Sequence, residues 1–332
     1  MTPVFANDQG QVTLFYESGN YGVTSGPAIW PGLVNSHEPD ENLNVITARY
    51  LGTAGRDVGL FIPGPRDFTG TLSYFPQDWR MLKFALGSCL DAGSPSPFTH
   101  NYSATNTNQG TIELGNSTSL PSFSIEDAQI STTAGSNLVR SFKGCMVDTM
   151  TLNFTQGEPV TVDIDYVAQT VVYASGAKSS VTANTDRPFH WGDFTFHLPS
   201  GTVINEVKGA TLAINNSLLA QHYVNGSTVI GLPIPQARDI TLGIEATATQ
   251  AWAKNLYDQY FLGGSTFNMI VGGTAVAGSR TIAITLSGCT LMDMSAPSAG
   301  EGEIVYSLEV QAQNAYALED STTQYYNSGS FQ

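Results

Sequence analysis

Apolar and polar residues alternate along most of the chain, which is the period-two pattern of half-buried β-strands. The alternation is clearest over residues 68–74, 160–166, 240–246 and 304–310. Gly, Asn and Asp gather between such runs, and these residue types predict tight turns. The pattern therefore predicts a mainly β protein.

Two stretches depart from the alternation and predict one short helix in each half of the chain. In Pro76–Gly87 and Gln250–Gly263 the apolar residues recur at spacings of three and four, which gives each helix one face toward the core. Proline near the start and glycine at the end suit the first of these helices. Each predicted helix follows an alternating strand.

A nine-residue motif occurs twice. Residues 59–67 match residues 231–239 at six of nine positions, with a constant shift of 238 − 66 = 172. The identical positions are Gly59, Leu60, Ile62, Pro63, Arg66 and Asp67 in the first copy, and Gly231, Leu232, Ile234, Pro235, Arg238 and Asp239 in the second. Internal repeats of this kind indicate duplicated structural units.

A second repeat closes both halves. Gly144-Cys145 and Gly288-Cys289 each precede a turn and an alternating run, at a shift of 289 − 145 = 144. The first half holds the additional residues between helix and final hairpin, and we place them in a long inserted loop at about 94–119, which is rich in Ser, Pro, Asn and Thr. We expect two tandem β-sandwich or barrel domains, each with one short α-helix, at 1–175 and 187–320, followed by a C-terminal tail at 321–332.

Charge limits the classes of function. The 332 residues include 13 Lys+Arg and 28 Asp+Glu, a net charge of −15, so a protein that grips nucleic acid through phosphate contacts is disfavoured. No apolar run of about 18 residues predicts a transmembrane helix, and Met1–Asp8 does not have the pattern of a secretory signal. Cys89, Cys145 and Cys289 are far apart and suit buried structural thiols.

Candidate catalytic or metal-binding groups are weak. Asp163 and Asp165 would share one face of a strand and could form the carboxylate pair of a glycoside hydrolase, but their counterparts in the second half are Ser307 and Glu309, which favours a polar face. His37–Glu41 offers potential metal ligands, yet its spacing matches no metal motif and favours a solvated turn. We expect no catalytic residues, no metal and no cofactor.

Several ordered stretches resemble the major tail tube proteins of long-tailed phages and archaeal tailed viruses. These stretches are Tyr50–Val58, Gly64–Leu72, Tyr74–Trp79, Ser122–Glu126 and Phe142–Asp148. The resemblance covers about residues 21–174 directly, and the second half chiefly through the internal repeat. It implies a structural protein that forms rings and stacks them into a tube, through which viral DNA passes into the host.

The resemblance also implies partners and location. Rings of this family commonly contain six domains, so a chain with two fused domains would reach six as a homotrimer. Ring-to-ring contacts would involve the inserted loop and the two terminal segments. The expected partners are the tail tip or baseplate, the tape measure and the tail terminator, with viral DNA only as a transient passenger. The protein would be part of the virion tail, assembled in the host cytoplasm, with no membrane association.

The acidity fits DNA that slides without sticking, because a wall of like charge and hydroxyl groups repels the phosphates. Asp163, Asp165 and Glu309 alternate with apolar positions and are the candidate acidic residues of the channel wall, although the same face could instead look outward to solvent. A second hypothesis is a secreted two-domain β-sandwich protein that binds carbohydrate or mediates adhesion. The absence of a secretory signal argues against that alternative.

Overall fold

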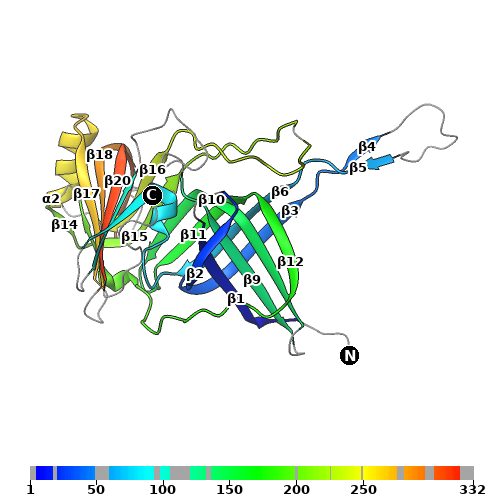
Figure 1. The fold of residues 1–332 in the computed structure, drawn as a ribbon. Coiled ribbons are helices and arrows are strands. Elements are labelled where there is room, and N and C mark those ends of the chain that lie inside the picture. The colour runs from blue at the N-terminus through cyan, green and yellow to red at the C-terminus, as the bar shows by residue number, and fades with distance from the viewer. Residues whose placement is uncertain are drawn as a thin grey trace.

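The protein is built from three antiparallel sheets, which two long strands connect (Figure 1). The computed structural model describes residues 5–17, 21–48, 60–92, 98–104, 120–131, 136–198, 201–224, 226–247, 250–274, 280–295 and 303–321. Strands dominate and the helices are short, so the predicted mainly β fold with two short α-helices is confirmed. The pairings of the described strands do not close into a barrel.

The central sheet runs across both halves of the chain and has eight strands. Its spatial order is β3 (Leu33–Asn42), β6 (Asp67–Phe75), β11 (Thr161–Ala168), β10 (Asn137–Thr155), β15 (Val207–Asn215), β16 (Asp239–Thr247), β19 (Val305–Ala312) and β18 (Thr281–Ser295). The pairing of β10 with β15 joins the strands of the first half to those of the second.

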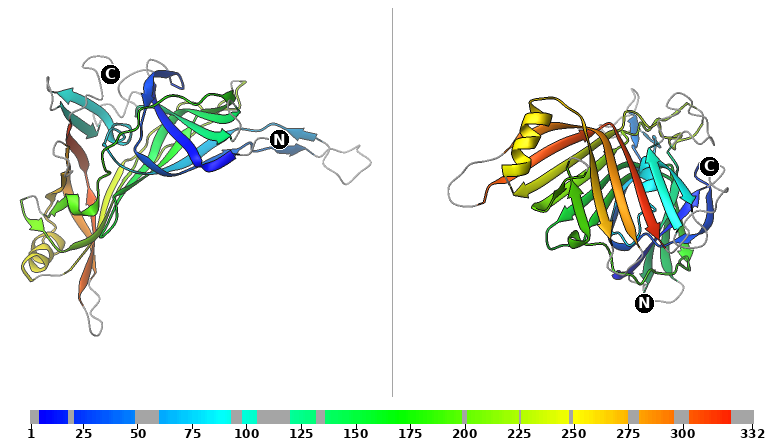
Figure 2. Two further views of the ribbon diagram at one scale, coloured as in Figure 1. Left: turned by 90° about the horizontal axis from the view of Figure 1, so that it is seen from below. Right: turned by 90° about the vertical axis from the view of Figure 1, so that its left-hand side faces the viewer.

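Two outer sheets complete the fold (Figures 1 and 2). The first has the order β2 (Thr24–Ile29), β1 (Phe5–Glu17), β9 (Phe123–Ser131), β10 and β12 (Thr170–Gly176). The second has the order β14 (Val203–Ile204), β13 (Phe194–His197), β17 (Phe267–Thr274), β18, β20 (Asn314–Ser321), β8 (Phe98–Ala104) and β7 (Gly87–Ala92). A separate hairpin of β4 (Ile46–Ala48) and β5 (Leu60–Ile62) projects from the body (Figure 2).

β10 and β18 each belong to two sheets because each bends at a glycine. Gly144 has φ 66° and Gly288 has φ 62°, a left-handed conformation that L side chains rarely adopt. A Cβ atom at Gly144 would also lie 2.8 Å from the Tyr21 ring. Residues 137–143 of β10 pair with β12, and residues 146–153 pair with β11. The bend lets one strand cross from an outer sheet to the central sheet.

The bend in β10 is held by a single carboxylate. Glu17 of β1 accepts hydrogen bonds from the backbone N–H groups of Gly144, at 2.7 Å, and Gly22, at 2.9 Å. It also accepts hydrogen bonds from the hydroxyls of Ser122 and Ser124, each at 2.6 Å. Four donors on two carboxylate oxygens tie β1, β9 and β10 together.

The core consists of the alternate apolar positions that the sequence pattern marks. Strands of the outer sheets and the central sheet bury one face each against the other, as expected for sandwiched sheets. Fully buried members include Leu72, Ile125, Phe142, Ile164, Leu242, Val271, Ile284 and Leu308.

The helices are shorter than the predicted stretches. The first is α1 (Leu82–Leu86), and the residues before it form a polar cluster: Gln77 accepts the indole N–H of Trp30 at 2.8 Å, and Asp78 pairs with Arg80 at 2.6 Å. The second is α2 (Gln250–Leu256), which continues as a π-helical turn, η2 (Tyr257–Phe261). A 3-10 turn, η1 (Trp191–Asp193), precedes β13.

Part of the predicted inserted loop is a strand. Residues 98–104 form β8, which pairs with β20 of the second half and with β7. Residues 105–119 lie outside the described part of the chain. The composition of this segment indicated a loop, but β20 offers a free edge whose N–H and C=O groups β8 satisfies.

Candidate functional site: the polar face of the central sheet

The central sheet has one face in the core and one polar face. Along each strand alternate residues point to the same side. The polar face carries hydroxyl, amide and carboxylate groups at the paired positions Asp40, Thr69, Thr71, Asp163, Asp165, Thr149, Thr151, Asn153, Thr211, Thr241, Glu245, Ser307, Glu309 and Asp293. This surface spans both halves of the chain.

Hydrogen bonds between neighbouring strands order this face. Thr71 Oγ1 donates to Asp165 Oδ1 at 2.6 Å, and Asn153 Nδ2 donates to Asp163 Oδ2 at 2.9 Å. Asp163 and Asp165 therefore lie on one face, as the i, i+2 spacing predicts. Glu309 lies opposite Gly243 on β16 and Asp293 on β18, on the same face but several strands away. The structure thus places the three residues on one surface without bringing them into one cluster.

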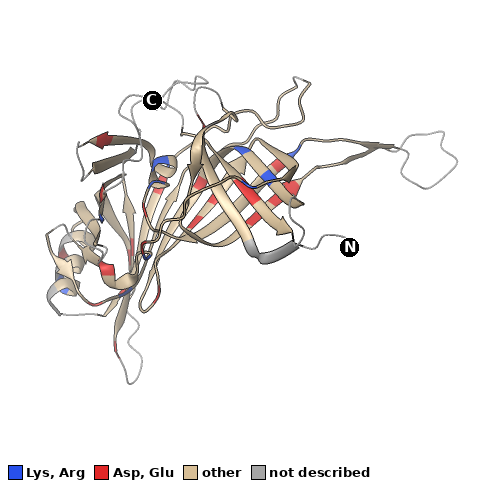
Figure 3. Ribbon diagram, turned by 60° about the horizontal axis from the view of Figure 1, so that its bottom comes forward, with Lys and Arg blue, Asp and Glu red and all other residues tan. Residues whose placement is uncertain are grey.

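In the described strands, the regularly paired positions of the polar face include acidic residues and no basic residue. Figure 3 marks the acidic and basic positions along the whole ribbon. Lys208 lies at the bulge between Val207 and Gly209 of β15, and it is paired with Glu303. The carboxylates of Asp163 and Asp165 accept hydrogen bonds from an amide and a hydroxyl, and these donors carry no charge. An anion that approached this face would meet uncompensated negative charge.

The first copy of the nine-residue motif lies at the base of the projecting hairpin. Leu60 and Ile62 belong to β5, Pro63 follows them, and Gly59 lies outside the described residues. The backbone N–H of Arg66 donates to Thr228 O at 2.7 Å. Asp67 begins β6, and its Oδ1 lies 2.7 Å from Nε2 of His222. The first copy thus contacts the segment that precedes the second copy.

The second copy lies against the junction of the two halves. Gly231, Leu232 and Pro235 belong to a loop in which Ile234 pairs with Leu219, and Asp239 begins β16. The side chain of Arg238 donates to Leu86 O, at the end of α1, at 3.1 Å, and to Asn216 Oδ1 at 2.9 Å. Burial lowers the pKa of the Arg238 guanidinium. Arg238 thus links the second copy of the motif to both halves of the chain.

Asn216 is the central polar residue of this junction. Its side chain is 1% exposed, and Nδ2 donates to Ala85 O and Val147 O, both at 3.1 Å. Its backbone N–H donates to Asp148 O at 2.7 Å, and the Asp148 carboxylate accepts the N–H of Leu218 at 2.7 Å. Sequence reasoning did not identify Asn216, and only its position one residue after β15 distinguishes it.

The predicted solvated turn at residues 37–41 was wrong, because these residues lie in β3. His37 is buried between the sheets and lies 2.8 Å from Tyr166 Oη and 3.2 Å from Asp127 Oδ2, which also pairs with Arg140. Burial raises the pKa of Asp127, but hydrogen bonds and charge from His37 and Arg140 more than offset it, so the pKa is below its usual value. The group is a structural network.

Cys89, Asp91 and His100 are brought together on β7 and β8, with their potential metal-ligating atoms within 4.8 Å of one another. The ring nitrogens of His100 are already engaged, Nδ1 with Asp91 at 2.7 Å and Nε2 with Ser321 at 2.9 Å. Burial, followed by the charge of Asp91, raises the pKa of the Cys89 thiol. The two hydrogen bonds of the His100 ring link β7, β8 and β20.

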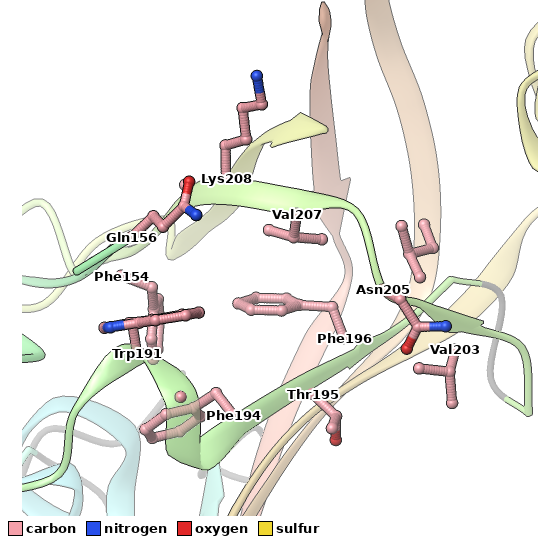
Figure 4. A pocket seen from close by; sticks show the side chains of 13 residues that line it. Phe154, Gln156, Trp191, Phe194, Thr195, Phe196, Val203, Asn205, Val207 and Lys208 are labelled. Atoms are coloured by element: carbon pink, nitrogen blue, oxygen red, sulfur yellow. The ribbon is translucent and has the colours of Figure 1, made fainter. Parts of the chain in front are cut away.

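A pocket of about 170 Å³ lies where β13 and β14 meet β15. Its lining combines aromatic side chains, such as Phe154 and Phe196, with polar ones, such as Asn205, while the Lys208 side chain points away from it (Figure 4). The pocket does not bring together an acid, a base and a nucleophile.

Comparison with known proteins identifies the family. Residues 8–312 match the family model for phage tail tube proteins. No curated protein matches the chain closely. None of the helices in the described part of the chain is both long and apolar enough to span a bilayer. A β-rich fold, an acidic polar face and a family match over most of the chain agree, and the chain belongs to the phage tail tube protein family, as a structural component of the virion tail.

Proposed function

We propose that the polar face of the central sheet lines the channel of the tail tube, and that the tube conducts viral DNA. The observation that carries this proposal is the acidic, hydroxyl-rich face that crosses eight paired strands without a basic residue at a regularly paired position in the described strands. DNA phosphates bind where Lys and Arg displace counterions, and this face offers no such groups. Asp163, Asp165 and Glu309 are accordingly proposed as residues of the channel wall.

The number of strands supports a ring of three chains. Eight strands per chain give twenty-four strands in a trimer. With about 4.8 Å between strands and a tilt of about 40°, such a barrel has a backbone diameter of about 48 Å, and of about 38 Å after side chains are subtracted. This channel is wider than a DNA duplex. Two chains would leave only about 22 Å by the same geometry.

We infer that the chain contains two copies of one tube domain, at 1–175 and 187–320, so that a trimer presents six domains. The last four strands of the first half recur in the second half at a constant shift of 144 residues, for example 281 − 137 = 144. The four pairs of first residues are Phe123 of β9 and Phe267 of β17, Asn137 of β10 and Thr281 of β18, Thr161 of β11 and Val305 of β19, and Thr170 of β12 and Asn314 of β20. The pairing order β6–β11–β10 also recurs as β16–β19–β18.

The proposal extends to the assembled tail. Stacked rings would join a tail tip or baseplate at one end and a terminator at the other, around a tape measure protein, with assembly in the host cytoplasm. Membership of a tail tube family supports self-assembly with other tail proteins. Co-expression with neighbouring tail genes and isolation of tube complexes would test each partner.

Selective labelling tests which face lines the channel. Asp165→Cys places an exposed thiol on the polar face, and the matched control Glu158→Cys places one in an exposed turn outside the sheet. In assembled tubes a small maleimide should label both variants, whereas a maleimide on a large polymer should label only the control. Equal labelling of both variants by the large reagent in intact tubes would show that the polar face looks outward.

A further inference from the structure

The two outermost strands of the central sheet each have a free edge. Within the described residues β3 pairs only with β6, and the C-terminal part of β18 pairs only with β19. Exposed edges offer unpaired N–H and C=O groups and act as templates for another strand. Seven antiparallel pairings separate these two strands, so β3 and the C-terminal part of β18 run in opposite directions.

The junction inside the chain supplies a template for how such edges join. β10 is the counterpart of β18, at a shift of 281 − 137 = 144. β15 is likewise the counterpart of β3. Asn42 of β3 pairs with Asp67, the last residue of the first copy of the nine-residue motif, and Asn215 of β15 pairs with Asp239, the last residue of the second copy. The shift between β3 and β15 is therefore 215 − 42 = 173. Inside the chain, β10 pairs with β15. Their counterparts, β18 and β3, are the two strands with free edges at the ends of the central sheet.

Details at the ends of β3 and β15 support this correspondence. The side chain of Asn42 accepts the backbone N–H of Asn44 at 3.0 Å, and the side chain of Asn215 accepts that of Ser217 at 2.8 Å. Asn44 and Ser217 have φ of 42° and 47°, and no other non-glycine residue in the described part of the chain has a positive φ. A bulge also interrupts each strand, between residues 34 and 36 and between residues 207 and 209, at the same shift of 207 − 34 = 173.

We propose that β18 of one copy pairs antiparallel with β3 of a second copy, in the register of the internal β10–β15 pairing. This inference rests on the proposed ring, and it specifies the seam between neighbouring chains. In the internal pairing Asn216 donates to Asp148 O, and Thr149 lies opposite Asn215. The two shifts convert this register into the pairs Met292–Leu43, Asp293–Asn42, Met294–Glu41 and Ser295–Asp40.

The side chains at the free edges support a covered surface. Leu43 is 53% exposed and Met292 is 55% exposed, whereas their counterparts Asn216 and Asp148 are engaged in the internal junction. The proposed seam places Leu43 and Met292 opposite one another and buries both apolar side chains. Asn42 and Asp293 then lie together on the polar face, so that face continues from one chain to the next.

Cysteine cross-linking in assembled rings tests the register. Directly opposed residues in an antiparallel pair have Cα atoms about 4.5–5.5 Å apart, within the range of a disulfide. Oxidation of an Asn42→Cys, Asp293→Cys double variant should link neighbouring chains into dimers and trimers on non-reducing gels. The matched control Asn42→Cys, Met294→Cys shifts one cysteine by one position to the opposite face, and it should give at least tenfold less cross-linking.

Mixing two single-cysteine chains separates intermolecular from intramolecular pairing. β3 and β18 lie about 34 Å apart across the sheet of one chain, too far for an internal disulfide. Oxidation of a mixture of Asn42→Cys and Asp293→Cys chains should therefore give covalent dimers, and wild-type protein oxidised in parallel corrects for the native thiols.

Electron microscopy of the same samples distinguishes failure of the seam from failure of the proposed function. Rings that cross-link in the control register, or in neither register, would overturn the proposed seam. The proposed function as a tube would remain supported in that case, because the rings still form. Samples that form neither rings nor tubes would overturn the proposed ring and the seam with it.

Discussion

The substitution Asn216→Leu tests whether the junction between the halves depends on a buried hydrogen-bond network. Leu has the same branched outline as Asn, so the change removes polar contacts while largely keeping the shape of the side chain. The site is 1% exposed, so water does not replace the lost partners in the folded state. The backbone pairing of β10 with β15 involves other atoms and remains available.

The expected loss of stability follows from the contacts of the side chain. Two hydrogen bonds to carbonyl oxygens, at 3.1 Å, are worth about 1 kcal/mol each, and the bond from the charged Arg238 is worth about 2 kcal/mol. The greater apolar character of Leu offsets about 1 kcal/mol. The free energy of unfolding should therefore fall by about 3 kcal/mol.

Urea denaturation followed by tryptophan fluorescence and circular dichroism measures this loss. With a slope of about 3 kcal/mol per molar urea, the midpoint should fall by about 1 M. Asn205→Leu makes the same substitution at an exposed position and should leave the midpoint unchanged. A double-mutant cycle with Arg238→Met should give a coupling of about 1 kcal/mol or more between the two residues.

A midpoint for Asn216→Leu that equals that of the Asn205→Leu control would refute the reasoning. It would mean that the junction relaxes and rehydrates at no cost. Additivity in the cycle would refute the narrower statement that the bond between Arg238 and Asn216 contributes to stability.

Three further outcomes are expected. Glu17→Gln should lower the free energy of unfolding by about 2 kcal/mol in urea titrations, because either orientation of the amide turns its NH₂ toward one backbone N–H; Glu17→Ala should cost more. The lowered pKa of Asp127 stabilises the fold above the unfolded value near 3.9, and this stability is lost as pH falls below about 4, so Asp127→Asn should show a shallower loss of melting temperature between pH 5 and 3 than wild type. A Leu43→Asp, Met292→Asp variant should stay folded by circular dichroism but lose ring assembly in native mass measurements, since it would bury two unpaired carboxylates; Leu90→Asp, at a position 69% exposed and outside the central sheet, is the control that should still assemble.

Local patterns predicted much of the architecture. Alternation over residues 68–74, 160–166, 240–246 and 304–310 marked the strands β6, β11, β16 and β19, since a strand with one buried face must alternate. The repeated motif and the repeated Gly-Cys pair indicated two similar halves from residue identity and spacing alone. The same alternation placed Asp163 and Asp165 on one face, because that inference needs only the geometry of a single strand.

Other features depended on contacts between distant segments. Residues 98–104 have loop-like composition, yet they form β8 because β20, near the opposite end of the chain, offers an edge. His37 belongs to a run of polar residues and is buried only because Asp127 and Tyr166 satisfy its ring nitrogens. The helix predicted from Pro76 begins at Leu82, and the Gln77 and Asp78 side chains before it bind Trp30 and Arg80.

The sequence by itself determined that this is a β-rich, acidic, twice-repeated chain with alternating strands and polar positions at fixed spacing, since those properties depend only on residue type and period. The tertiary structure decided that β10 of one half pairs with β15 of the other, which turns two short polar faces into one surface of eight strands. It also decided which edges remain free. The physical reason is that backbone N–H and C=O groups can pair with any strand edge, so the partner is selected by packing and by side chains such as Asn216, which period and composition do not reveal.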